Sequence, residues 1–330
     1  MRWDPNRVES QKLAVHAALL HTGKIVYFSG DEHDPGRHFL GKASSTYVDS
    51  TRVYDCATGA VSVLPSPQVP IGAATPDLFC CGHAFLSDGQ LLVAGGTESW
   101  TRGHPGDPDP GGHHTHGHFT GLRYTWIFDP EVAPGTNPWK RAADMLPERG
   151  RTVGGGRWYP TLVTLAGGQC IALSGHPSTT HIGEHNNRMV ETFEPAPAPF
   201  GHWEDRGDLP PGLDINLYPR LHLFRNYQGY GEVFCVTPMG NRCYAWQQAT
   251  STWRDVAAAP ADTEYHGFRT TSILLPLLPH QNYEPRILLC GSAEPLVLNP
   301  LSPTRGGSRP QVHVSPSAAA PRASGFISTP

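Results

Sequence analysis

The chain repeats one pattern about five times, and this repeat limits the available folds more than any other feature. Each unit begins with an apolar run, a turn that contains glycine or asparagine, and a second apolar run that ends in small residues. A later segment carries an aromatic residue and an acidic turn, as in HAFLSDGQLLVAGG followed by TWIFDP. Because these turn residues adopt positive φ easily, they favour β-hairpins. Each unit therefore predicts about four short antiparallel strands.

Units of this size and strand content are typical of the blades of a β-propeller. The glycine pair after the second apolar run and the later tryptophan favour the kelch type. Charged residues are only 16% of the chain, whereas it has 36 glycines and 33 prolines, which suits short strands and turns rather than long helices. We predict an all-β fold, a kelch-type β-propeller of about five four-stranded blades over residues 1–300, either closed or part of a larger propeller.

The two ends of the chain differ from the repeats. Residues 301–330 are rich in proline, serine and alanine and carry no strand pattern, so we predict a flexible tail. The first residues lack the apolar segment of a signal peptide, and no apolar run is long enough for a membrane helix. The net charge of −4 gives no basic field for nucleic acid. These features predict a cytoplasmic protein without nucleic-acid or membrane partners.

Two short motifs stand directly before the apolar runs of consecutive units: FCCG at residues 79–82 and RWY at residues 157–159. Most of the seven cysteines lie inside apolar strand-like runs, where a buried structural thiol is the simplest interpretation. Cys80 and Tyr159 instead come immediately before the innermost strand of neighbouring blades. We therefore expect them side by side near the propeller axis, at one mouth. Cys81 should point the opposite way by strand alternation and pack between sheets.

Together, these motifs and the hairpins that follow them resemble the galactose oxidase and glyoxal oxidase family of radical-copper oxidases, and more closely its bacterial kelch-domain relatives. The resemblance covers most of residues 13–300. In that family a cysteine sulfur is bonded to the ring of a tyrosine that binds copper and carries a radical. The resemblance implies that Cys80 and Tyr159 form this thioether pair. It also implies oxidation of a primary alcohol, an aldehyde or a carbohydrate by O2, with H2O2 as product.

The copper ligands implied by the resemblance are two tyrosines and two histidines, with one open position for substrate. Such a set suits copper(II), which prefers square nitrogen and oxygen ligands, and a bound metal lowers the pKa of a phenol. Tyr159 is the first ligand. The only Tyr-His pair in the chain, Tyr265-His266, is the candidate for the next two, although the family positions counted from the following Leu-Leu-Pro fall on Phe268 and Arg269.

Other features depart from the family pattern. The last histidine ligand normally comes from an immunoglobulin-like domain, which has no counterpart after residue 300, and the tryptophan that stacks on the tyrosine would fall near His176. His83 could substitute for a ligand, but it should lie farther along its hairpin. We therefore predict an oxidase homologue that is incomplete as this single chain, to which a partner chain could add blades. The isolated chain should produce negligible peroxide from primary alcohols, aldehydes or galactose.

Two alternatives remain open from the residues alone. A non-catalytic kelch propeller could bind a protein or glycan through its loop face, because a fold by itself does not decide function. Three polar segments could also bind a metal ion through imidazole or carboxylate groups. For each we favour a solvated loop, and we predict that the histidine-rich loop from His104 to His118 is a mobile surface insertion. The segments are residues 29–34, 104–118 and 178–187.

Overall fold

A computed structural model of the protein describes an all-β chain in which the described residues contain strands and one short 3-10 helix, but no α-helix. The described residues are 10–11, 14–28, 51–65, 67, 77–100, 119–178, 180, 186–196, 201–213, 215, 217–225, 231–236, 242–258, 271–290 and 296–298. The predicted tail and the three polar segments therefore lie wholly or mostly outside them. No helix in the described part of the chain is long and apolar enough to cross a membrane.

Three sheets consist of four antiparallel strands that pair in chain order, as the repeat predicts. Their strands are β1 (His16–Leu19), β2 (Lys24–Phe28), β3 (Thr51–Asp55) and β4 (Val61–Leu64); β10 (Thr161–Thr164), β11 (Cys170–Leu173), β12 (Met189–Glu194) and β13 (His202–Asp208); and β14 (Arg220–Arg225), β15 (Gly231–Val236), β16 (Arg242–Gln247) and β17 (Thr252–Ala258).

The other two sheets vary this plan. In the second sheet of the chain, an additional strand pairs with the far end of β6, which makes the sheet five-stranded. The last sheet has three strands among the described residues. The strands of these two sheets are β5 (Asp77–Phe85), β6 (Leu91–Trp100), β7 (Phe119–Gly121), β8 (Thr125–Phe128) and β9 (Trp139–Arg141); and β18 (Thr271–Leu274), β19 (Ile287–Cys290) and β20 (Leu296–Leu298).

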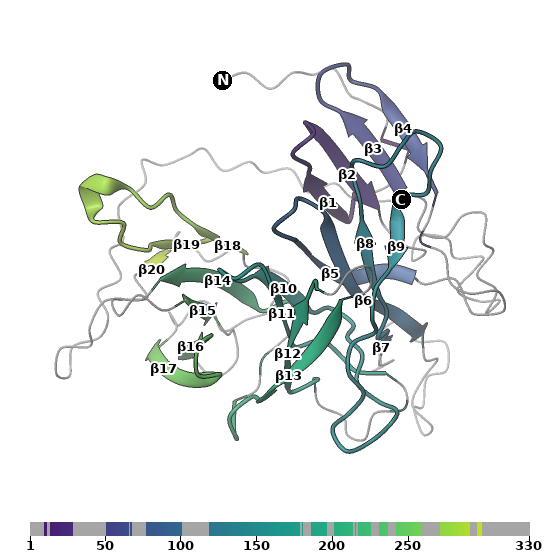
Figure 1. Cartoon of the computed structure of the whole chain (residues 1–330). Coiled ribbons are helices and arrows are strands. Elements are labelled where there is room, and N and C mark those ends of the chain that lie inside the picture. Colours follow the sequence, from purple (N-terminus) through teal and green to yellow (C-terminus); the bar gives the residue numbers. More distant parts are fainter. Residues whose placement is uncertain are drawn as a thin grey trace, which may run out of the picture.

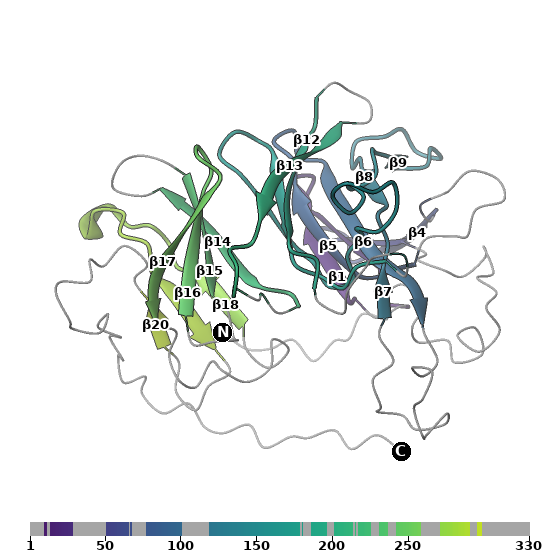
Figure 2. The same ribbon diagram turned by 90° about the horizontal axis from the view of Figure 1, so that it is seen from below.

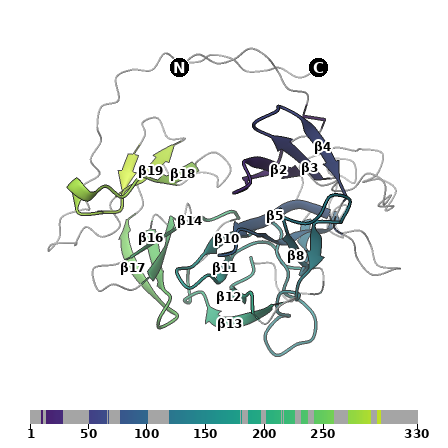
Figure 3. The same ribbon diagram turned by 45° about the horizontal axis from the view of Figure 1, so that its top comes forward.

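The five sheets follow one another around a common axis in chain order (Figures 1 and 2). The first strand of each sheet lies innermost, and β5, β10, β14 and β18 contact one another in that order. Figure 3 shows the sheet β1–β4 and the sheet β18–β20 on either side of a part of the ring that the described strands leave open. The fold is thus propeller-like. The five predicted units correspond to five sheets, although the described strands form no closed ring.

The core lies between sheets. Each of four apolar clusters combines residues of two consecutive sheets; Phe28 of β2, for example, packs with Val93 of β6 and Trp126 of β8. Strands β8 and β11 are buried at every position because a neighbouring sheet covers each face. Burial also raises the pKa of Cys170 in β11 to about 12. This thiol is structural, as the sequence predicts.

The tryptophan of the repeat links one sheet to the next. The indole N–H of Trp139 in β9 donates to the Thr51 hydroxyl of β3, at 2.8 Å. One sheet further on, Trp203 in β13 donates to the Thr125 hydroxyl of β8, at 3.0 Å. In each pair the threonine is the first residue of the third strand of the preceding sheet. These hydrogen bonds fix how consecutive sheets are stacked around the axis.

Candidate functional site

Three residues hold the same backbone position at the start of consecutive inner strands. Cys80, Tyr159 and Tyr218 have φ values of 63°, 64° and 47°, in the left-handed region that residues other than glycine seldom adopt. Cys80 and Tyr159 each lie six residues before a leucine, Leu86 and Leu165, that accepts the hydrogen bond closing the hairpin turn. Neighbouring structure must hold such a backbone, and strained positions of this kind gather at functional sites.

Hydrogen bonds connect these three residues into a chain around the axis. The Tyr159 N–H donates to the Cys80 carbonyl at 2.7 Å, and the Tyr218 N–H donates to the Tyr159 carbonyl at 2.9 Å. The Tyr218 hydroxyl donates to the Cys81 carbonyl at 3.0 Å, which links β14 back to β5. Cys80 and Tyr159 therefore lie side by side, as expected from their positions. Cys81 packs in the cluster between the first two sheets, also as expected.

Aromatic rings surround the pair. Trp158 stacks on Tyr159 with ring centroids 3.9 Å apart and an interplanar angle of 24°. The centroid of the Tyr218 ring lies 4.5 Å from the centroid of the Tyr159 ring. The family position for a stacking tryptophan holds His176 in this chain, and the ring that stacks on Tyr159 is its neighbour Trp158 instead. The positive φ of Tyr159 interrupts the alternation that would place adjacent side chains on opposite faces.

A cavity of about 330 Å³ lies beside this cluster, along the inner strands of the first four sheets. Tyr159 is half-buried at its wall, whereas Cys80 is fully buried. The lining side chains that could react or bind a metal ion are His16, Cys80, Cys81, His83, Tyr159 and Tyr218. His16 and Tyr218 are not among the site residues predicted from the sequence. A signal for Tyr218 was present, because Tyr-Pro recurs at residues 159–160 and 218–219.

Three ionisable groups of this cavity are held neutral. Burial, reinforced by the nearby Cys81, Cys80 and Tyr159, raises the pKa of Tyr218 well above its ordinary value. Burial and the neighbouring His83 lower the pKa of His16 to about 3. Burial also lowers the pKa of His83. At neutral pH the cavity therefore presents a phenol and two uncharged imidazoles, whose lone pairs are available as acceptors or metal ligands.

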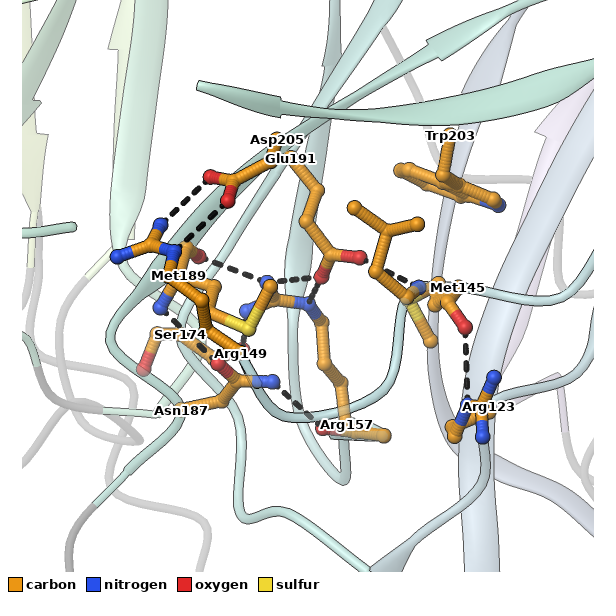
Figure 4. Close-up of polar contacts among 12 residues, drawn as sticks. Arg123, Met145, Arg149, Arg157, Ser174, Asn187, Met189, Glu191, Trp203 and Asp205 are labelled. Atoms are coloured by element: carbon orange, nitrogen blue, oxygen red, sulfur yellow. Dashed lines mark hydrogen bonds and ion pairs between the residues drawn. The ribbon is translucent and has the colours of Figure 1, made fainter. Parts of the chain in front are cut away.

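A buried ion pair holds the RWY segment in place (Figure 4). Arg157 and Glu191 are both fully buried and pair side chain to side chain. Arg157 also donates to the carbonyls of Ser174 and Met189, each at 2.7 Å. Glu191 accepts the Leu146 N–H at 2.8 Å. Because the segment before β10 lacks a continuous strand ladder, these contacts fix the backbone that presents Tyr159 to Cys80.

The glycine of the FCCG motif permits the close approach of two sheets. A Cβ atom at Gly82 would lie 2.5 Å from Leu162 Cδ1 and 2.9 Å from the Pro160 carbonyl oxygen. Both neighbours belong to the next sheet or to the turn that leads into it. A larger residue at Gly82 would therefore push β5 away from Tyr159.

Several predicted site residues lie outside the described part of the chain. These include Tyr265 and His266, the histidines from His104 to His118, and the acidic segment at 29–34. Among the residues that are described, no group of three or more His, Cys, Asp or Glu side chains is arranged to hold a metal ion. The full copper ligand set of the sequence analysis therefore stays a prediction.

Comparisons with known proteins give limited information about function. No family model matches the chain. A WSC domain-containing protein from Arthroderma benhamiae is 30% identical over 151 residues, which is 44% of this chain but only 13% of that protein. The chain thus spans a small part of the length of this relative.

Solved structures that resemble the chain are distant from it. An arabinanase from Penicillium chrysogenum superposes with a TM-score of 0.45 at 10% identity, covering 89% of this chain and 78% of its own. The protein YjhT gives 0.44 at 11% identity, covering 84% and 78%. The NanB sialidase of Streptococcus pneumoniae gives 0.42 at 8% identity, covering 91% and 59%. Similarities this low carry no argument about activity.

Proposed function

We propose that the axial cavity is the site of a kelch-type, galactose oxidase-like radical-copper oxidase, in which Cys80 and Tyr159 become a covalent pair. The observation that carries the proposal is their juxtaposition: a backbone hydrogen bond of 2.7 Å joins them. Trp158 stacks on the Tyr159 ring, where it would cover an oxidised ring from water. The substrate would be a primary alcohol or aldehyde, including the hydroxymethyl group of a sugar.

The donors around the cavity suit copper chemically. The phenols of Tyr159 and Tyr218 and the imidazoles of His16 and His83 offer the oxygen and nitrogen atoms that copper(II) prefers. Copper, when bound, would supply one-electron chemistry and polarise the substrate oxygen. Tyr265 and His266 remain the other proposed ligands.

Each residue has a defined part in the proposed chemistry. Cross-linking would form a bond between Cys80 Sγ and a Tyr159 ring carbon, breaking one S–H and one C–H bond while two protons and two electrons reduce O2 to H2O2. In turnover, the Tyr159 oxygen would accept a hydrogen atom from the substrate carbon. Overall, an alcohol and O2 would give an aldehyde and H2O2.

Intact mass measurement tests the cross-link. Protein exposed to copper and air should become lighter by the mass of two hydrogen atoms, and peptide mapping should join residue 80 to residue 159. Cys80→Ser and Tyr159→Phe should abolish this change, whereas Cys170→Ser, which removes a buried thiol from a different strand, should retain it. An unchanged wild-type mass would refute the covalent pair.

Turnover is a separate question from the cross-link. Because the described residues provide no established complete ligand set, the isolated chain should produce negligible peroxide. Further blades, from a partner chain or a longer protein, would restore activity by covering the open part of the ring. There β1 exposes Leu19 and β18 exposes Ile273, at 65% and 54%. Robust peroxide production by the chain alone that depends on Cys80 and Tyr159 would show that it is already complete.

A non-catalytic glycan-binding propeller is the second candidate. A polar cavity of about 290 Å³ between the second and third sheets favours it. Glu98, Arg123, Asp144 and Ser178 line this cavity and could hydrogen-bond sugar hydroxyl groups. Binding of an oligosaccharide that is lost in Asp144→Ala but kept in Tyr159→Phe would support this function over the oxidase.

A further inference from the structure

Two histidines from different sheets meet at the wall of the axial cavity. His16 lies on β1 of the first sheet, and His83 lies on β5 of the second. Their ring centroids are 5.6 Å apart, with the planes nearly perpendicular at 86°. Both residues line the cavity. Sequence spacing gives no sign of this pair, since the residues are far apart in the chain and belong to different repeats.

One nitrogen of the pair lacks a partner. His16 is only 6% exposed, and its Nε2 atom is buried without a hydrogen bond. Its ring packs against Phe28, with centroids 5.3 Å apart, so one side of the imidazole is apolar. Burying a polar atom without a partner costs free energy, and nearly all such atoms in folded proteins are satisfied. A ligand that binds a neutral imidazole would therefore satisfy this nitrogen.

We propose that His16 and His83 together bind one transition-metal ion of the type that imidazole prefers, such as Zn²⁺ or Cu⁺. Metal–nitrogen bonds of about 2.0–2.1 Å place the centroids of two imidazoles on one ion roughly 5–6 Å apart, and the observed 5.6 Å falls in this range. Imidazole binds such ions in its neutral form, which is the form that burial favours here. The remaining coordination positions are available to water or to a small ligand in the cavity.

Apart from the two neutral histidines, the described residues that line this cavity include no basic or acidic side chain. The other lining groups are the thiols and phenols of Cys80, Cys81, Tyr159 and Tyr218, together with apolar residues, glycine, proline and threonine. The fixed positive charge beside this wall is Arg220, which donates to the Tyr218 carbonyl at 2.9 Å. The pair adds to the proposed Tyr265 and His266 ligands, so the inference rests on the same cavity as the proposed function and assigns its two nitrogen donors. It does not require the Cys80–Tyr159 cross-link.

Zinc titration tests the site without any redox chemistry. The chain should first have the histidines between 104 and 118 replaced by serine, so that they add no adventitious binding. Titration calorimetry at pH 7.5 should then show one Zn²⁺ site per chain. His16→Gln and His83→Gln should each weaken this site at least ~10-fold, and the double variant should show no specific Zn²⁺ site, because both ligands hold one ion.

Two controls keep the result interpretable. His21→Gln removes an exposed histidine that contacts Glu131 at 3.0 Å, and it should leave the site intact. Circular dichroism of each variant without zinc checks folding; if His16→Gln does not fold, His83→Asn at the half-buried partner takes its place. Equal zinc binding in wild type and both histidine variants would overturn the proposal, as would dependence on only one of them. Histidine-dependent zinc binding in a protein whose mass stays unchanged after exposure to copper and air would uphold this site while refuting the covalent pair.

Discussion

The three middle sheets differ from the first sheet at the start of the innermost strand. In the middle sheets this position holds Cys80, Tyr159 or Tyr218, each with a positive φ and each joined to its neighbour by a hydrogen bond. In the first sheet, the residue six before the turn leucine Leu20 is Ala14, which has no reactive group. Along β1 every second residue is exposed, and β18 of the last sheet alternates in the same way.

This difference arises from neighbours rather than from the repeat itself. A middle sheet is covered on both sides, so its first strand can be held in a strained backbone by contacts from the next sheet. An outer sheet has such a neighbour on one side only among the described strands. The reactive side chains with a strained backbone therefore lie in sheets that have a neighbouring sheet on each side.

The largest expected effect comes from the ion pair that supports the middle sheets. Arg157→Leu leaves the Glu191 carboxylate buried without its partner, which should lower the free energy of unfolding by about 3–5 kcal/mol. Arg149→Leu is the matched control, because Arg149 pairs with Asp205 at an exposed edge of the same sheet; it should cost less than about 1 kcal/mol. Urea denaturation measures both. Similar losses for the two variants would show that burial does not distinguish them.

Crowding between the second and third sheets should give the next largest effect. Gly82→Ala forces a methyl group against Leu162 and the Pro160 carbonyl, so we expect a loss of about 2–3 kcal/mol. Gly231→Ala in the fourth sheet meets only Gln248 Oε1 at 3.1 Å and Leu223 Cδ1 at 3.9 Å, and should be much milder. Thermal unfolding of both variants compares a glycine between two sheets with a glycine inside one sheet. A harmless Gly82→Ala would mean that the sheets can separate without cost.

Acid should weaken the joint between the first and second sheets. The pKa of His16 is lowered to about 3, so the unfolded chain binds a proton more readily than the folded one. The stabilising contribution is complete above about pH 6.5 and is lost as the pH falls toward the folded pKa, by up to about 2 kcal/mol at pH 5. His16→Gln should flatten this pH dependence, whereas His21→Gln should not. Urea unfolding at pH 7.5, 6 and 5 gives the comparison.

The smallest effect concerns the tryptophan links. Trp253 of β17 packs in the cluster that contains Val190 of β12, but its indole N–H is buried without a hydrogen-bond partner. When the third strands are aligned on Tyr54, Phe128 and Phe193, Val190 takes the place of Thr51 and Thr125 in the two preceding sheets. Val190→Thr should therefore stabilise the protein by about 0.5–1 kcal/mol, because it supplies the missing acceptor. Thr51→Val should destabilise it by about 1–2 kcal/mol. Thermal unfolding that shows stability changes of opposite sign in the two variants would confirm that a threonine acceptor for the tryptophan N–H stabilises each pair of sheets.

Much of the fold could be predicted from the sequence because its signals are local. Apolar runs and glycine turns such as Asp88-Gly89 specify hairpins, and their repetition specifies a series of four-stranded sheets. The same local order places FCCG and RWY at equivalent points of adjacent units. The proximity of Cys80 and Tyr159 follows from that order once the units are arranged around an axis.

The hairpins, the repeat and the alignment of its units can be predicted from the sequence, since these depend on residues close together in the chain. Three contacts come from the packing of the folded chain: Trp158 stacks on Tyr159, Arg157 pairs with Glu191, and His16 lies against His83. The left-handed backbone at Tyr159 interrupts strand alternation, so no periodic rule gives the direction of its neighbours. Contacts between sheets depend on how each sheet is rotated around the axis, which is set by core packing over many residues distant in sequence.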